Sequence, residues 1–89
     1  MKAVITVIGK DTVGILSKVS TACAESGVNI IEVTQSVLQD LFAMIMLADI
    51  EDAVIPFDAL REKLDRLGSE NNLKIHVMHE DIFNSMHRI

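Results

Sequence analysis

Hydrophobic and polar positions follow two different periods along the chain, and each change of period predicts a change of secondary structure. Residues 2–8 are rich in β-branched side chains and apolar on both faces, which predicts a central strand. From Ile15 to Cys23 the apolar positions recur every three or four residues, as in an amphipathic helix that Gly27 would end. Residues 28–38 return to period two, which predicts a strand with one buried and one polar face.

The second half of the chain repeats this order. Leu41–Ile50 is the most apolar segment, which predicts a strand in the middle of the sheet. Pro56 suits the start of a helix, and we expect Gly68 to end it. Residues 73–77 alternate again as a last strand. Residues 80–89 predict a short C-terminal helix, which is too short to be stable alone and must pack on its own sheet or on a partner.

The resulting order is βαββαβ plus a C-terminal helix. With right-handed crossovers, the compact arrangement is an α+β, ferredoxin-like sandwich with a four-stranded antiparallel sheet and two helices on one face. We expect a single domain over residues 1–89, with a core at 1–79 and a helical tail at 80–89. One sheet face would remain bare and partly apolar. Because 49% of this 89-residue chain is hydrophobic, we also expect a homodimer that covers some of that surface.

Charge and composition exclude several classes of function. A net charge of −5 and a pI near 4.9 argue against binding to nucleic acid or to anionic membranes. RNA recognition on this fold also needs aromatic residues on the first and third strands, where only Phe42 occurs. The single cysteine, Cys23, excludes an internal disulfide and is expected to be a buried structural thiol. With no signal peptide pattern and no apolar run of about 20 residues, we expect a cytoplasmic protein.

Residues that could carry out catalysis or bind a metal are sparse. His76, His79 and Glu80 resemble metal ligands, but strand positions an odd number apart point to opposite faces, so we expect no metal site. The positions available give no Ser/His/Asp or Cys/His grouping with an orienting partner, and the chain has no P-loop. We therefore expect neither an enzyme nor a cofactor.

Polar chemistry concentrates around the first predicted helix. Asp11 or Thr12 can cap that helix, and Gly14 within its first turn permits either tight packing or the approach of a ligand. The free N–H groups and dipole at a helix N-terminus attract a carboxylate, and Asn29 offers both a donor and an acceptor. With Asp11 meeting an ammonium group, these residues would suit a free amino acid. In the alternative interpretation, Asp11 is only a cap, Asn29 only a turn residue and Lys10 only exposed.

Three short segments, V-I-G, K-D-T-V-G-I and G-V-N-I, together with the helix between the last two, resemble the ACT domain, a regulatory amino-acid-binding module. The similarity covers essentially the whole chain and is greatest to small stand-alone ACT proteins of uncharacterised function, and to the ACT halves of a glycine-cleavage repressor. It implies pairing of domains, with ligands held between subunits. The candidate ligand-binding residues, including the neighbouring lysine, are Lys10, Asp11, Thr12, Val13, Gly14, Asn29 and Ile30.

Two functional hypotheses follow. The first is a homodimeric regulatory module that binds an amino acid or a related small acid. The second is a protein–protein interaction or assembly module that keeps the fold but binds no metabolite. It is motivated by Val13, where the family often has proline, by the apolar tail and by the lack of an attached output domain. In either case the output is expected to pass through a separate protein partner.

Overall fold

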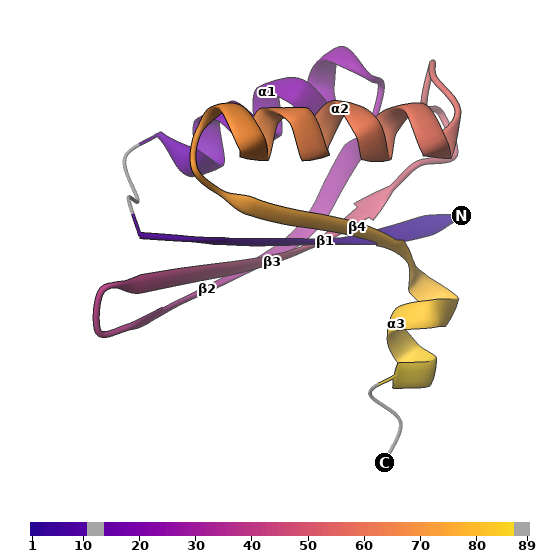
Figure 1. Ribbon diagram of the computed structural model, residues 1–89. Helices are drawn as coiled ribbons and strands as arrows, with labels where there is room; N and C mark the ends of the chain where they lie inside the picture. Colours follow the sequence, from indigo (N-terminus) through magenta and orange to yellow (C-terminus); the bar gives the residue numbers. More distant parts are fainter. Residues whose placement is uncertain (11–13, 87–89) are drawn as a thin grey trace.

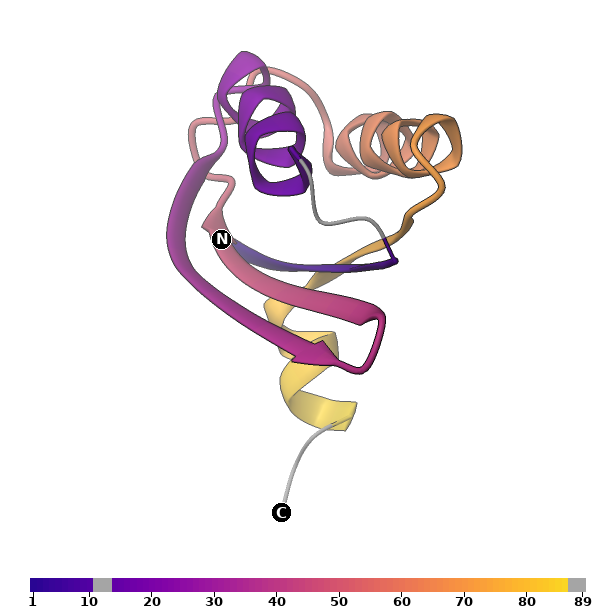
Figure 2. The same ribbon diagram turned by 90° about the vertical axis from the view of Figure 1, so that its left-hand side faces the viewer.

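The computed structural model describes residues 1–10 and 14–86 and shows the secondary structure elements in the predicted order (Figure 1). The elements are β1 (Lys2–Gly9), α1 (Ile15–Glu25), β2 (Asn29–Leu38), β3 (Leu41–Asp49), α2 (Phe57–Glu70), β4 (Lys74–His79) and α3 (Glu80–Met86). The four strands form one antiparallel sheet in the order β2-β3-β1-β4. Helices α1 and α2 cover one face, and α3 projects from the other (Figures 1 and 2). The predicted ferredoxin-like fold with a C-terminal helix is confirmed.

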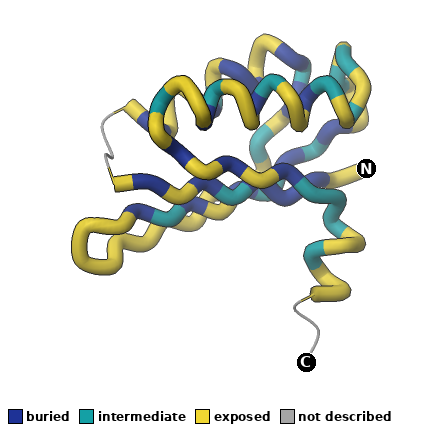
Figure 3. The backbone as a smooth tube through the Cα atoms, in the orientation of Figure 1, coloured by how far each residue is buried: buried dark blue, intermediate teal, exposed yellow. Residues whose placement is uncertain are grey.

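The hydrophobic core lies between the sheet and the two covering helices (Figure 3). Alternate residues of the middle strands point toward the helices, so Ile5 of β1 and Met44 and Met46 of β3 are completely buried. Leu60 and Leu64 of α2 are equally buried and close the core from the other side. The pattern explains why β1 and β3, the most apolar strands, occupy the middle of the sheet as predicted.

Helix α1 begins one residue after Gly14, which is the N-cap and has a left-handed backbone with φ of +72°. The prediction that Gly14 lies inside the first turn is therefore wrong. Because left-handed geometry is strained for residues with a Cβ atom, the chain uses glycine there for its backbone conformation. Within the described part of the chain, no side chain caps the helix at this position. The proposed caps Asp11 and Thr12 lie outside the described residues.

Gly27 terminates α1 as predicted. Its φ is +73°, and the N–H groups of Gly27 and Val28 donate to the carbonyl oxygens of Ala24 and Cys23 at 3.1 and 2.9 Å. This pair of hydrogen bonds is a Schellman motif, which satisfies carbonyl groups at the end of the helix. The motif turns the chain directly into β2.

Gly68 does not end α2, contrary to the prediction, because the helix continues to Glu70. The residue instead lies where α2 meets the entry to β4. A Cβ atom on Gly68 would lie 2.7 Å from the carbonyl oxygen of Leu73 and 3.1 Å from Cγ1 of Ile75. Close packing of α2 against β4 thus explains the glycine at position 68. The left-handed backbone conformation in the turn after α2 is adopted by Asn72, with φ of 56°.

Strand β2 forms one edge of the sheet and is almost entirely exposed, so the prediction of a buried face is wrong. Val33 and Val37 pair with Met46 and Phe42 and therefore point toward the helix side of the sheet. The β2–β3 hairpin twists away from the helices (Figure 1), and Val37 is left 65% exposed. An apolar edge is consequently available on the single chain.

Candidate functional site

The predicted ligand-binding residues lie at opposite ends of the molecule. Lys10 follows the last residue of β1, and Gly14 precedes α1 at the same end. Asn29 and Ile30 begin β2 at the other end, where Asn29 pairs with Asp49, the residue that also pairs with Lys2. The seven residue steps of β1 from Lys2 to Gly9 span roughly 23 Å at about 3.3 Å per residue. A single chain therefore does not bring Asn29 to the loop before α1.

The Gly14 end offers open space beside the start of a helix. Among the residues that the structure describes, a Cβ atom on Gly14 would meet only Cε of Lys18, at 3.9 Å, so contacts with these residues do not explain the glycine. The first turn of α1 contains no acidic residue, and Gly14 supplies no capping side chain. Because the first N–H groups of a helix lack intrahelical partners, this end carries partial positive charge. It is chemically suited to a carboxylate. Asp11, Thr12 and Val13, the other predicted residues of this loop, lie outside the described residues.

The Asn29 end offers an amide. Asn29 is the first residue of β2 rather than part of the turn, and its side chain is exposed. Within residues 1–10 and 14–86, no hydrogen bond engages that side chain, so its donor and acceptor are both available. Ile30 is half-buried and packs against the core, which fixes the start of the strand. The amide is thus held on a rigid element with its polar atoms exposed.

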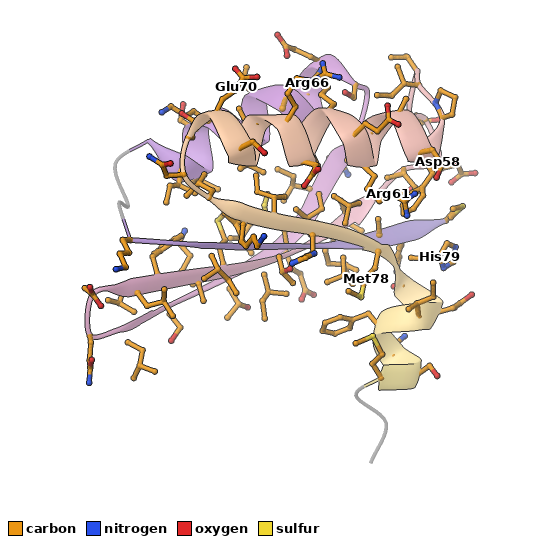
Figure 4. All side chains as sticks on the ribbon, in the orientation of Figure 1. Asp58, Arg61, Arg66, Glu70, Met78 and His79 are labelled. Carbon is orange, nitrogen blue, oxygen red and sulfur yellow. The ribbon has the colours of Figure 1, made fainter. Side chains whose placement is uncertain are left out.

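Sequence analysis missed an open groove of about 400 Å³ between α1 and α2. Lys63 of α2 bridges the two helices, since its Nζ atom lies 3.4 Å from Oε1 of Glu25 and donates to Oγ of Ser26 at 3.1 Å. At the other end of the groove, Nζ of Lys18 donates to Oδ1 of Asn71 at 2.9 Å. The residues lining the groove are Ser17, Lys18, Thr21, Ala22, Glu25, Lys63, Arg66, Leu67 and Glu70, and Figure 4 shows Arg66 and Glu70 on the side of α2 away from the sheet. The groove is lined by both basic and acidic side chains, and the Lys63–Glu25 ion pair links the two helices across it.

The remaining groups show no reactive chemistry in the part of the chain that the structure describes. Burial raises the pKa of the Cys23 thiol to about 11, although the positive charge of Lys63 opposes the shift. The thiol therefore stays protonated at neutral pH, which agrees with the expected structural role. Within residues 1–10 and 14–86, no group of three or more His, Cys, Asp or Glu side chains is placed to bind a metal ion. The same residues contain no helix that is long and apolar enough to cross a membrane.

Comparison with known proteins shows how far the arrangement is shared. The family model described as ACT domain matches residues 2–78. A UPF0237 protein of Clostridium acetobutylicum is 46% identical over 89 residues, which is the full length of both chains. The solved structure of an ACT domain protein from Streptococcus pneumoniae is 40% identical, superposes with a TM-score of 0.82 and covers 93% of each chain.

A more distant structure shows the same domain within a longer protein. It is assigned as a glycine cleavage system transcriptional repressor, is 25% identical and has a TM-score of 0.72. The match covers 89% of this chain and 47% of the repressor. These matches run along nearly the whole chain and agree on one fold. The chain therefore belongs to the ACT domain family, together with the UPF0237 proteins.

Proposed function

We propose that this ACT domain is a regulatory module that binds an amino acid or a related small acid as a homodimer. ACT domains are generally regulatory modules for small molecules, and the matched repressor is a regulatory protein by its assigned name. One observation supports the arrangement most strongly. The two groups suited to a zwitterion, the start of α1 and the Asn29 amide, lie at opposite ends of one chain beside an exposed strand edge.

A two-fold axis at the β2 edge would bring these two groups together. Pairing β2 antiparallel to its copy would place the Asn29 end of one chain beside the Leu38 end of the other. The loop before α1 lies at that second end, because Gly9 and Val37 both pair with Phe42. Each of two equivalent sites would then combine the α1 N-terminus of one copy with Asn29 of its partner. The pairing would also cover Val37 and satisfy the free backbone groups of the edge.

The chemistry of the proposed site follows from its parts. The ligand carboxylate would accept hydrogen bonds from the first N–H groups of α1, where the helix dipole adds to the attraction. The Asn29 amide would orient the ligand as both donor and acceptor. Asp11 is the expected partner for the ammonium group, and Lys10, Thr12 and Val13 are expected beside the ligand. Binding at the dimer edge would couple ligand occupancy to association, which a separate protein partner could read.

A thermal-shift panel of free amino acids and related small acids tests this function. A ligand at about 100 times its Kd adds roughly 2.7 kcal/mol of stability, which in a domain of this size raises the Tm by on the order of 10 °C. Asn29→Ala should abolish the shift and leave the dimer intact. Asn84→Ala, at another exposed asparagine, is the matched control and should respond like the wild type. A folded protein with no shift for any compound would refute amino-acid binding.

The second candidate is an assembly module that binds a separate protein and no metabolite. The exposed Ile82 and Met86 of α3 favour it, because such side chains mark contact surfaces when they cluster. Truncation after Glu80 should then abolish capture of the partner from lysate while Asn29→Ala has no effect. Unchanged capture by the truncated chain would rule out this function.

A further inference from the structure

We infer that α3 and the uncovered sheet face form a second contact between copies of this chain, separate from the β2 edge. We call the sheet surface opposite α1 and α2 the open face. Its apolar residues on the middle strands are Val4, Ile8, Leu41, Ala43, Ile45 and Leu47. Ile45, at the centre of this surface, is 44% exposed. No proposed feature of the amino-acid site uses this face.

Helix α3 covers only one end of the open face. Phe83 lies over Val4, Ile45 and Leu47, where a shallow cavity of about 230 Å³ remains beside it. The rest of the helix projects away from the sheet in both ribbon views (Figures 1 and 2). Ile82 and Met86 are 55% and 66% exposed. The side of α3 that carries Ile82 and Met86 is therefore open to contact with another chain.

The open face is complementary to itself. α3 starts at the His79 end of β4, whereas the uncovered apolar residues Ile8 and Leu41 lie toward the Lys74 end. A two-fold axis parallel to the sheet and perpendicular to its strands would exchange these ends. Each α3 would then lie against the uncovered end of the other copy, as an isologous interface requires.

Charge favours a second copy over an unrelated protein. α3 begins with two acidic residues, Glu80 and Asp81. The opposite end of the same face carries Lys74, which pairs with Ile8. The two-fold arrangement brings the acidic end of each copy to the basic end of the other, so the apolar and charged features match together. With the β2 edge also paired, the assembly would be a tetramer built from two different two-fold contacts.

Sedimentation velocity of single variants tests this contact. Ile82→Asp places a charge on the exposed side of α3 and should halve the particle mass, from tetramer to dimer. Asp65→Lys is the control, because Asp65 is exposed on α2, on the side of the sheet opposite α3 (Figure 1), and it should leave the mass unchanged. If the β2 edges do not pair, the wild type is a dimer through α3 alone, and Ile82→Asp should convert it to a monomer. The mass of the wild type therefore shows whether the β2 contact forms, independently of the α3 contact. An unchanged mass for Ile82→Asp would overturn the inference.

A charge exchange gives a second test that does not depend on removing an apolar side chain. Lys74→Glu should weaken the association, because it places an acid opposite Glu80 and Asp81. Adding Asp81→Lys to the same chain should restore it. The two positions lie at opposite ends of β4, so the rescue can arise only between copies. Failure of the double variant to recover the wild-type mass would show that these ends do not meet.

Discussion

Replacing Gly68 with alanine tests how α2 is held against the sheet. Alanine inside a helix is normally more favourable than glycine by about 1 kcal/mol. At this position the new Cβ atom would lie 2.7 Å from the carbonyl oxygen of Leu73 and 3.1 Å from Cγ1 of Ile75, whereas ordinary contacts begin at 3.4 Å. The neighbouring backbone is not free to move, since the Leu73 N–H donates to the Gly68 carbonyl at 2.8 Å. We therefore expect a loss of stability.

The size of that loss follows from two opposed terms. Overpacking a closely packed contact costs about 1–3 kcal/mol, and weakening one hydrogen bond costs about 1 kcal/mol more. The helical preference for alanine returns about 1 kcal/mol. The net change is a decrease of about 1–3 kcal/mol in the free energy of unfolding, which corresponds to a Tm lower by roughly 5–15 °C.

Urea denaturation followed by circular dichroism measures this change. All samples need the same protein concentration, because association shifts apparent stability. Ser69→Ala is the matched control on the next residue of α2, where the side chain is exposed and alanine should stabilise by a few tenths of a kcal/mol. A Gly68→Ala protein as stable as the Ser69→Ala protein would show that the close approach of helix and strand is wrong.

Two other predictions concern the folded core. Gly27→Ala should destabilise the protein by about 2 kcal/mol or more, because φ is +73° and the new Cβ atom would lie 2.7 Å from the carbonyl oxygen of Asp52. A urea unfolding midpoint equal to that of the wild type would contradict this prediction. Burial raises the pKa of Cys23 from 9.0 to about 11, so the unfolded chain releases the thiol proton at a lower pH than the native chain. The contribution of this thiol to the free energy of unfolding is complete below pH 9 and falls by about 1.4 kcal/mol per pH unit between pH 9 and about 11. Unfolding free energies of the wild type and of Cys23→Ala, compared across that pH range, measure this change. Parallel pH profiles for the two proteins would refute it.

The sequence predicts the fold well because the spacing of hydrophobic residues indicates which face of each strand or helix is apolar. The order of strands and helices, the central positions of β1 and β3 and the end of α1 at Gly27 all follow from it. The pattern does not say what covers an apolar face. Val33 and Val37 alternate correctly for a buried face, but β2 is an edge strand that twists away from the helices.

Glycine shows a second limit of sequence reasoning. At Gly27 and Gly68 the residue is the same and the local context is similar, a glycine near the end of an amphipathic helix. Only the tertiary structure separates a left-handed turn at Gly27 from close packing against β4 at Gly68. The groove between α1 and α2 is a similar case, since Lys18 and Lys63 have partners on elements far apart in the sequence.

For the candidate site, the spacing of residues along the sequence also limits where the ligand groups can lie. The predicted ligand groups flank α1, and an 11-residue helix is roughly 16 Å long. The loop before it and the strand after it must therefore lie apart within one chain. The structure makes this separation explicit, which is compatible with a site shared between two subunits, as the ACT resemblance implies.

The most direct test of that proposal mixes two binding-deficient variants. Asp11→Ala and Asn29→Ala are each expected to lose amino-acid binding in isothermal titration calorimetry. In a shared site, a mixed dimer contains one site with both defects and one site with neither. After random exchange of equal amounts, about a quarter of all sites should bind with wild-type affinity. Recovery of that fraction is the predicted result, and a mixture that binds no ligand would contradict a site built from two subunits.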